Sequence, residues 1–314
     1  MMVGALIRQD LAVSPAKAGT RLPRCRQPQR WEMGFRFRGT DENRIGRTLA
    51  IRLLPILSAL LLATPANATR PGDTILIASD STAADYPAAR YPQTGWGTML
   101  RCAVVPGVRI ANHATGGRST RSFLAEGRWD RLLADILPGD VVLIQFGHND
   151  QARGRPERWA PAQTDYRANL LRFIWDVRTA GGQPVLVTPV ARRNFGADGR
   201  AVADYPAWSG VMRDLAARTH TRLIDLEARS RAWLDRVGPE GAKALYLHYR
   251  AEDHVAAFPE GIADNTHFSE LGARQVADLV AQGIKALDLP IAAKIMAQRP
   301  ALARSTALGR TDCQ

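Results

Sequence analysis

The sequence contains few cysteines, three in 314 residues. Cys25 lies in an Arg-rich N-terminal stretch, which leaves Cys102 and Cys313 for the remainder of the chain. An even pair of cysteines in an oxidising compartment permits one disulfide. Because Cys313 stands next to the last residue, this bridge is permitted by the sequence but not required by it.

Repeats and low-complexity segments are also absent. Their absence excludes solenoids and fibres, whose sequences repeat with periods of about 20 to 50 residues. Hydrophobic residues make up 46% of the chain, which is enough to bury a full core. Without a targeting segment the length suits one domain of roughly 250 residues.

Three motifs of common enzyme classes are missing. The sequence has no Gly-x-Ser-x-Gly, which disfavours the α/β-hydrolase fold, and no His-Glu-x-x-His or phosphate-binding P-loop. It also has no block of Lys and Arg interleaved with aromatic residues. We therefore expect no nucleic-acid partner.

The formal net charge of +12 is concentrated near the N-terminus. Residues 1–68 carry 11 of the 42 Lys and Arg but 4 of the 30 Asp and Glu, so the remainder has a net charge of +5. That is an ordinary protein surface, although a basic face can steer an acidic polymer toward the protein.

Residues 46–68 have the features of a secretory signal peptide. Basic residues precede the apolar run 53–63, and Ala66-Asn67-Ala68 gives the small-x-small cleavage pattern. The apolar run is too short, and too interrupted by proline, to cross a bilayer core of about 30 Å. We expect cleavage near Ala68, no stable membrane anchor, and a periplasmic or extracellular protein.

The segments before and after the predicted signal peptide are expected to differ in structure. Residues 1–45 are Arg-rich, lack hydrophobic periodicity and contain a second candidate start at Met33, which indicates a disordered or mis-assigned extension. Residues 69–290 are expected to form the catalytic domain, and residues 291–314 a C-terminal helix and tail.

Short apolar runs alternate with longer amphipathic stretches from Thr74 onward, which is typical of repeated βα units. The runs are nearly continuous, as expected for strands buried on both faces of a parallel sheet. The fold predicted is α/β, a three-layer α/β/α sandwich with a mostly parallel five-stranded sheet. Candidate strands are 74–79, 108–114, 140–147, 184–190 and 222–226, and candidate helices include 96–102, 129–136, 165–179, 207–219 and 269–287.

In open parallel sheets the ligand binds beyond the carboxyl ends of the strands. Polar clusters containing Ser81, Gly117 and Asn149 follow the first three strands, and Asp264 and His267 stand before the last helix. Acyl transfer needs a hydroxyl nucleophile, a base, a group that orients the base, and donors for the oxyanion. The ordinary pKa of histidine, about 6.5, allows a neutral imidazole base at neutral pH.

Each of these residues also has a purely structural interpretation. Ser81 is suited to cap a helix, Asp264 to form a cap or an Asx turn, and His267 to lie on the surface. Asn149 and Gly117 are common turn residues. The joint occurrence of three of them after predicted strands and of the Asp264–His267 pair before the last helix, in this order, favours the chemical interpretation.

Four sequence blocks carry a family resemblance: Asp80-Ser81-Thr82, the segment 112–119 containing Gly117, Gly147-His148-Asn149-Asp150, and Asp264-Asn265-Thr266-His267. In this order they resemble the blocks of SGNH hydrolases, also called the GDSL superfamily. The segments 118–123, 146–150 and 266–269 further resemble the rhamnogalacturonan acetylesterase branch. In the family the nucleophile block usually reads Gly-Asp-Ser, and here Ser79 occupies the glycine place.

The resemblance implies a flavodoxin-like sheet, no metal and no cofactor. It implies that Ser81, Asp264 and His267 form a catalytic triad. It also implies an oxyanion hole of the Ser81 N–H, the Gly117 N–H and the Asn149 side chain. Arg118 and His148 are candidates for substrate binding, since a guanidinium matches a sugar carboxylate.

The function expected is a secreted esterase that removes acetyl groups from a carbohydrate, with rhamnogalacturonan as the leading candidate. Its partner would be an acetylated polysaccharide or oligosaccharide. The alternatives within this chemistry are an acetylesterase for xylan or other oligosaccharides, and a lipid or aryl esterase. A non-catalytic carbohydrate-binding protein has no need of the full set of catalytic residues.

Overall fold

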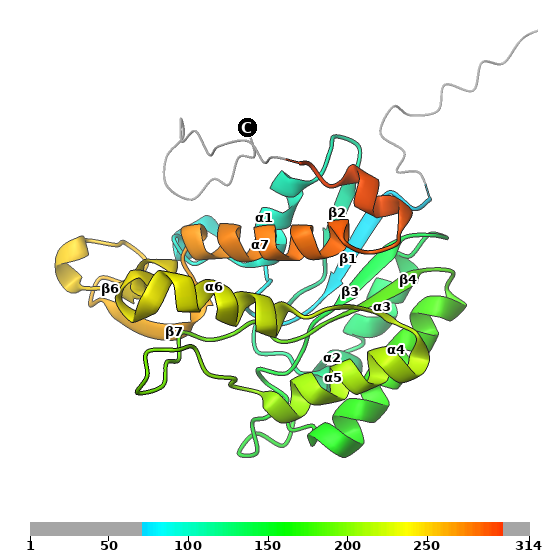
Figure 1. The fold of residues 1–314 in the computed structure, drawn as a ribbon, viewed down its shortest axis with the longest axis horizontal. Helices are drawn as coiled ribbons and strands as arrows, with labels where there is room; N and C mark the ends of the chain where they lie inside the picture. The colour runs from blue at the N-terminus through cyan, green and yellow to red at the C-terminus, as the bar shows by residue number, and fades with distance from the viewer. Residues whose placement is uncertain (1–70, 298–314) are drawn as a thin grey trace, which may run out of the picture. The chain divides into compact units, whose positions relative to one another are not determined.

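The computed structural model describes residues 71–297 (Figure 1). Its centre is a five-stranded parallel sheet with the strand order β2-β1-β3-β4-β5. The strands are β1 Thr74–Ala78, β2 Arg109–Asn112, β3 Val141–Ile144, β4 Gln183–Val187 and β5 Arg222–Ile224. The α/β class and the parallel five-stranded sheet expected from the sequence are confirmed.

Helices cover both faces of the sheet. Side chains alternate along a strand, so Ile75 and Ile77 of β1 pack into one buried core while Leu76 and Ala78 pack into another. The helices α1, α6 and α7 lie on the first face and α2 to α5 on the second (Figure 1). Their bounds are α1 Trp96–Leu100, α2 Thr120–Ala125, α3 Arg128–Ala134, α4 Arg167–Thr179, α5 Pro206–Thr219, α6 Leu226–Gly241 and α7 Glu270–Lys285.

All five strands end earlier than the apolar runs suggested. The strand β1 ends at Ala78, and Ser79, Asp80 and Ser81 leave the sheet as a loop, although Ser79 is fully buried. In the described part of the chain the non-glycine residues with positive φ are His220 and His254, so Ser79 has no need of glycine's left-handed freedom. A serine therefore fits where the family pattern has glycine.

A second, two-stranded sheet departs from the expected pattern. The strands β6 Tyr246–Tyr249 and β7 Ile262–Phe268 pair antiparallel, with an irregular register between Tyr246 and Leu247. The residues Asp264 and His267 thus belong to a strand that is not among the five candidates. The sequence did not predict β7 because it has no continuous apolar run to mark it as a strand.

The last described residues pack on the main sheet domain. A short 3-10 helix spans Pro290–Lys294, and Ile291 and Ile295 are buried in the same core as β1. Cys102 is buried and disulfide-bonded. Cys313, with which the sequence permits Cys102 to pair, lies outside the described part of the chain, as do the predicted extension 1–45 and signal peptide 46–68.

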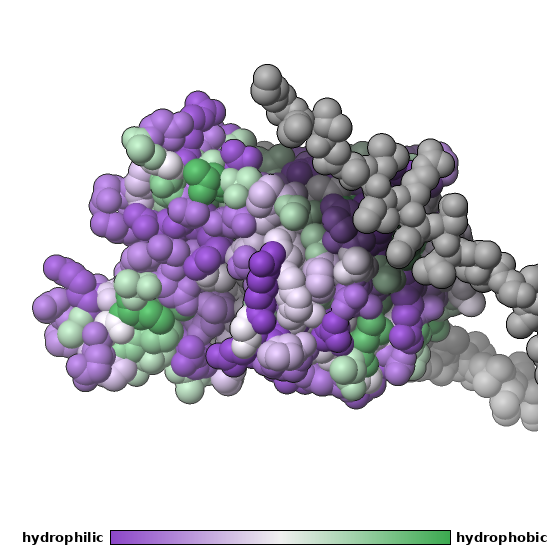
Figure 2. Space-filling view, turned by 90° about the horizontal axis from the view of Figure 1, so that it is seen from below, coloured by the Kyte–Doolittle hydropathy of each residue, from purple (hydrophilic) through white to green (hydrophobic). Residues whose placement is uncertain are grey.

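The face of the molecule in Figure 2 is mostly hydrophilic, with hydrophobic residues in small separate patches. Between residues 71 and 297, no helix combines the length and apolar character needed to cross a membrane.

Candidate active site

Ser81 lies just beyond the carboxyl end of β1, next to a buried carboxylate. Asp80 is fully buried, and its Oδ1 accepts hydrogen bonds from the Thr82 N–H at 2.9 Å and the Thr82 hydroxyl at 2.8 Å. The Tyr86 hydroxyl donates to the Ser81 carbonyl oxygen at 2.7 Å. These bonds fix the loop backbone on both sides of the Ser81 hydroxyl.

His267 connects Ser81 with Asp264, although 186 residues separate the serine from the histidine. His267 Nε2 lies 2.9 Å from Ser81 Oγ, and His267 Nδ1 lies 2.6 Å from Asp264 Oδ2. The second Asp264 oxygen accepts from the N–H groups of Thr266 at 2.7 Å and His267 at 3.0 Å. The structure thus brings the three predicted triad residues into one hydrogen-bonded line.

The environment keeps Asp264 ionised. Partial burial raises the pKa of this carboxyl, but the hydrogen bond and charge of His267 and the two backbone N–H donors outweigh burial and lower the pKa to about 2. Asp264 is therefore a carboxylate above about pH 2. An ionised Asp264 accepts the Nδ1 proton of His267 and leaves Nε2 as the acceptor that faces Ser81.

Tertiary contacts hold β7 in this place. The Phe268 side chain is buried, and its carbonyl oxygen accepts from the Thr94 N–H at 3.1 Å. Ser269 caps α7 by accepting from the Gly272 N–H at 3.2 Å. Arg193 donates from its backbone to the Asn265 carbonyl oxygen at 2.8 Å and from its guanidinium to the Asn265 side chain at 3.2 Å.

The predicted oxyanion donors Gly117 and Asn149 are linked through Arg118, and Gly116 lies against Ser81. Gly117 has φ of +77°, a conformation that favours glycine, and a Cβ added to Gly116 would lie 3.8 Å from Ser81 Cβ. Within residues 71–297 no protein acceptor pairs with the N–H of Ser81 or of Gly117. The Asn149 side-chain nitrogen donates one hydrogen bond, to the Arg118 carbonyl oxygen at 3.1 Å, and keeps a second hydrogen to donate.

Asp150 ties the Asn149 loop to helix α2. Its Oδ1 accepts from the Thr120 N–H at 2.9 Å and from the Thr120 hydroxyl at 2.6 Å. Asp150 is fully buried, and burial raises its pKa to about 7. The contact joins the loop of Asn149 to the helix that follows Gly117, so the two predicted donors are held by one connected framework.

His148 does not have the position that substrate binding would need. Its Nδ1 lies 3.1 Å from Asp80 Oδ2 and its Nε2 lies 3.0 Å from the Val190 carbonyl oxygen, while the side chain is 4% exposed. Both ring nitrogens are occupied, and the ring packs edge-on against Tyr205. His148 therefore braces the buried Asp80 beside the nucleophile, and its predicted contact with a sugar is replaced by this role.

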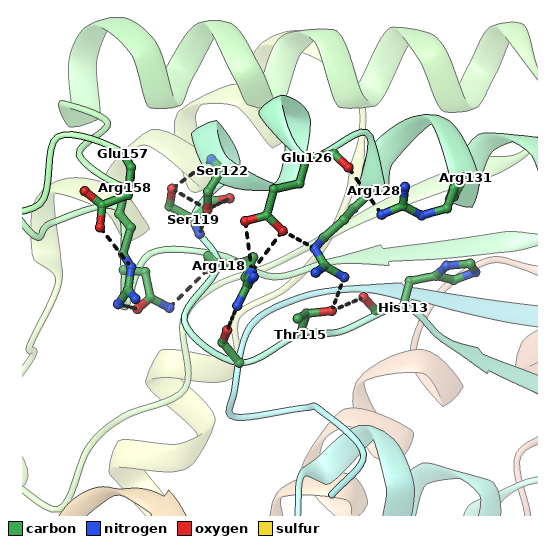
Figure 3. Close-up of polar contacts among 12 residues, drawn as sticks. His113, Thr115, Arg118, Ser119, Ser122, Glu126, Arg128, Arg131, Glu157 and Arg158 are labelled. Atoms are coloured by element: carbon green, nitrogen blue, oxygen red, sulfur yellow. Dashed lines mark hydrogen bonds and ion pairs between the residues drawn. The ribbon is translucent and has the colours of Figure 1, made fainter.

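Arg118 also differs from its expected role. Its Nε lies 3.1 Å from both carboxylate oxygens of Glu126, and its guanidinium donates to the Gly116 carbonyl oxygen at 2.7 Å. Figure 3 shows Arg118 turned toward Glu126, and Arg158 beside a different carboxylate, Glu157. The protein thus takes two of the five Arg118 N–H donors, and the Glu126 carboxylate compensates the charge of the guanidinium.

Arg158 is a residue that the sequence reading missed. Its guanidinium lies against Gly117, since a Cβ added there would meet Arg158 Nη2 at 3.1 Å, and its Nη1 lies 3.5 Å from Asn149 Oδ1. One signal was available: three arginines stand in the segment 151–158, directly after the Asn149-Asp150 pair.

No group of three His, Cys, Asp or Glu side chains in residues 71–297 is arranged to hold a metal ion. The side chains joined by hydrogen bonds at the site are a hydroxyl, an imidazole and a carboxylate, and the Asn149 amide lies on a loop bonded to the Arg118 backbone. That set matches the requirements of acyl transfer through a serine.

The sequence profile of the GDSL-like Lipase/Acylhydrolase family matches residues 80–275. The chain belongs to this family. It is therefore a carboxylic ester hydrolase, the class to which named relatives of this chain also belong.

Two curated relatives are similar over most of their length. Rhamnogalacturonan acetylesterase RhgT of Bacillus subtilis (strain 168) is 41% identical over 217 residues, which cover 69% of this chain and 91% of the relative. The probable rhamnogalacturonan acetylesterase YesY of the same organism is 36% identical over 225 residues, covering 72% and 98%.

A solved structure agrees with the fold. The crystal structure of YXIM_BACsu from Bacillus subtilis superposes with a TM-score of 0.58 at 28% sequence identity. The match covers 68% of this chain and 56% of that one, so this chain corresponds to about half of the larger protein.

Proposed function

We propose that this protein is a serine esterase that removes acetyl groups from a pectic polysaccharide, with rhamnogalacturonan as its substrate. The observation that carries the proposal is the hydrogen-bonded line from Ser81 through His267 to Asp264. The substrate is inferred from the similarity to RhgT, whose name gives rhamnogalacturonan as the ester-bearing polymer.

In this mechanism Ser81 Oγ attacks the acetyl carbonyl carbon while His267 Nε2 takes the hydroxyl proton. The negative charge that develops on the carbonyl oxygen accepts hydrogen bonds from the N–H groups of Ser81 and Gly117 and from the Asn149 amide. Collapse of the tetrahedral intermediate breaks the ester C–O bond, and the sugar oxygen takes the proton from His267 and leaves as a hydroxyl. A water molecule then attacks the acetyl-enzyme through the same steps, with His267 again accepting the proton, and acetate is released.

A cavity of about 420 Å³ is the proposed site for sugar residues of the polymer beyond the acetylated one, since none of the triad residues lines it. It lies between the loop that follows Ser81 and the loop that precedes Asp264. Tyr91 and Tyr249 offer rings that are apolar on their faces and polar at the hydroxyl, which suits a sugar. The cavity is lined by Ala88, Ala89, Tyr91, Pro92, Tyr249, Asp253, His254, Val255, Ala256 and Ala257.

The proposal is tested by acetate release from acetylated rhamnogalacturonan, acetylated homogalacturonan and acetylxylan, measured beside p-nitrophenyl esters of increasing chain length. We expect the highest kcat/KM on rhamnogalacturonan and a steep decline with acyl length. Similar rates on long acyl chains would exclude a carbohydrate acetylesterase, and a preference for acetylxylan would assign the enzyme to the xylan alternative.

Replacing Asn149 with alanine should lower kcat by about 10² to 10³ while KM changes little, since one oxyanion donor is lost in the transition state. Steady-state kinetics on p-nitrophenyl acetate measure both constants. A rise in KM at unchanged kcat would make Asn149 a substrate-binding residue and remove it from the oxyanion hole.

The pH profile should have an acid limb. The mechanism needs a neutral His267 ring to accept the Ser81 proton, so kcat/KM is expected to be lower in acid than in neutral or mildly alkaline solution. Asp264 adds no limb there, because its lowered pKa of about 2 keeps it ionised throughout. Initial rates on p-nitrophenyl acetate across this range provide the measurement, and a flat profile would place the base elsewhere.

We also propose export to the periplasm or the extracellular space after cleavage near Ala68. The support is the sequence of residues 46–68 alone. Expression of the full chain, followed by fractionation and N-terminal sequencing of the exported protein, tests it. An uncleaved chain retained in the cytoplasm would contradict the proposal.

A further inference from the structure

We propose that Arg158 forms an anion subsite that binds the carboxylate of a uronic acid residue in the substrate. The inference rests on the proposed function and adds to it a residue that selects an acidic polymer over a neutral one. Three observations carry it: the Arg158 guanidinium lies beside Gly117 and Asn149, it is partly buried, and other protein groups neutralise its positive charge only weakly.

The position of Arg158 brings a positive charge close to the reacting ester. Gly116 lies against Ser81, and Gly117, the next residue, lies against the Arg158 guanidinium. An acetylated sugar bound at Ser81 would therefore extend past the two glycines within reach of this cation. A carboxylate on that sugar, or on its neighbour in the chain, is the partner that a guanidinium binds best.

The protein itself neutralises Arg158 only weakly. Its Nε lies 3.7 Å from Glu157 Oε1, and the Glu157 side chain is 59% exposed, so water screens this pair. The Arg158 side chain is 32% exposed, and a charge that is partly removed from water attracts an anion more strongly than a fully solvated one. Arg118, by comparison, has two contacts of 3.1 Å with Glu126.

The segment that carries Arg158 is held in place by its own turns. Backbone hydrogen bonds run from Arg158 and Trp159 to the Arg155 carbonyl oxygen at 2.9 and 2.8 Å, and the Ala160 N–H donates to the Asp150 carbonyl oxygen at 3.0 Å. The Trp159 ring packs against Trp208. A held backbone reduces the entropy lost when the guanidinium binds a ligand.

The test compares two substrates that differ only at the uronic acid carboxyl group: acetylated rhamnogalacturonan oligosaccharides with free carboxylates, and the same oligosaccharides after reduction of the carboxylates to alcohols. The readout is the ratio of kcat/KM on the acidic substrate to kcat/KM on the reduced one. The contact of Arg158 with Asn149 affects both substrates alike, so the ratio isolates the effect of the carboxylate.

We expect the parent enzyme to favour the acidic substrate by about tenfold to a hundredfold, the range of one charge-assisted hydrogen-bonded pair. Arg158→Gln should bring the ratio close to one, and Arg158→Lys should keep part of the preference because it keeps the charge but not the fork of donors. The matched control is Arg155→Gln, which removes the same charge from an exposed position of the same segment and should keep the parental ratio.

Two results would overturn the inference: a parental ratio near one, or an Arg158→Gln enzyme that keeps the parental ratio. An equal decrease of the ratio in Arg158→Gln and Arg155→Gln would also overturn it, because it would show that any positive charge in this segment attracts the acidic substrate. Failure of the proposed function is distinct, since the parent would then release no acetate from either oligosaccharide.

Discussion

Replacing Ser81 with alanine is expected to lower the rate of ester hydrolysis by roughly 10⁶, the loss seen when a serine hydrolase loses its nucleophile. The Ser81 hydroxyl is the group that faces His267 Nε2, at 2.9 Å, and alanine offers no nucleophile there. Steady-state kinetics on p-nitrophenyl acetate measure the loss. Labelling of the parent by an organophosphonate, located by mass spectrometry of the peptides, identifies the reacting side chain.

Ser79→Ala is the matched control, because Ser79 is a serine of the same loop whose buried hydroxyl has no hydrogen-bond partner in the described structure. Removing an unpaired buried hydroxyl should leave stability and rate close to those of the parent. A Ser81→Ala enzyme within tenfold of the parent, or phosphonate on another residue, would mean that the nucleophile has been misassigned.

Replacing Asp264 with asparagine should cost about 10⁴ in kcat, as the equivalent change does in serine proteases. The two backbone N–H groups of Thr266 and His267 need an oxygen at the Oδ1 position, so the new amide nitrogen must face the His267 ring. An amide N–H donates to Nδ1 and traps the tautomer whose Nε2 carries the proton. That tautomer cannot accept the Ser81 proton.

The measurement is kcat on p-nitrophenyl acetate, with thermal unfolding to show that the fold persists. Glu252→Gln provides the control. The exposed carboxylate of Glu252 lies on the loop between β6 and β7, the strand that carries Asp264, and its loss should change the rate little. A normal rate for Asp264→Asn would show that another group orients the base.

The sequence alone determined the layers of the fold. Strands that are buried on both faces are mostly apolar, so β1, β3 and β4 are visible as nearly continuous apolar runs such as residues 75–78. The polar residues that follow these runs mark the carboxyl edge of the sheet. Ser81, Gly117 and Asn149 were therefore identifiable as site candidates before their contacts were known.

Only the tertiary structure decided how the side chains share their hydrogen bonds. The sequence places His148 and Arg118 beside predicted oxyanion donors. In the fold, however, His148 is within hydrogen-bond distance of Asp80 and Val190, and Arg118 donates to Glu126. Sequence proximity cannot show this, because the partners come from segments distant in the chain or from across a helix.

The placement of Asp264 and His267 likewise depended on tertiary contacts. The strand β7 lacks a continuous apolar run, and it is held by pairing with β6, by Thr94 and by Arg193. The position of Arg158 beside Gly117 also depends on tertiary contacts, because the two residues lie on separate loops. The sequence thus determined which chemical groups are present at the edge of the sheet, and long-range packing decided which of them meet.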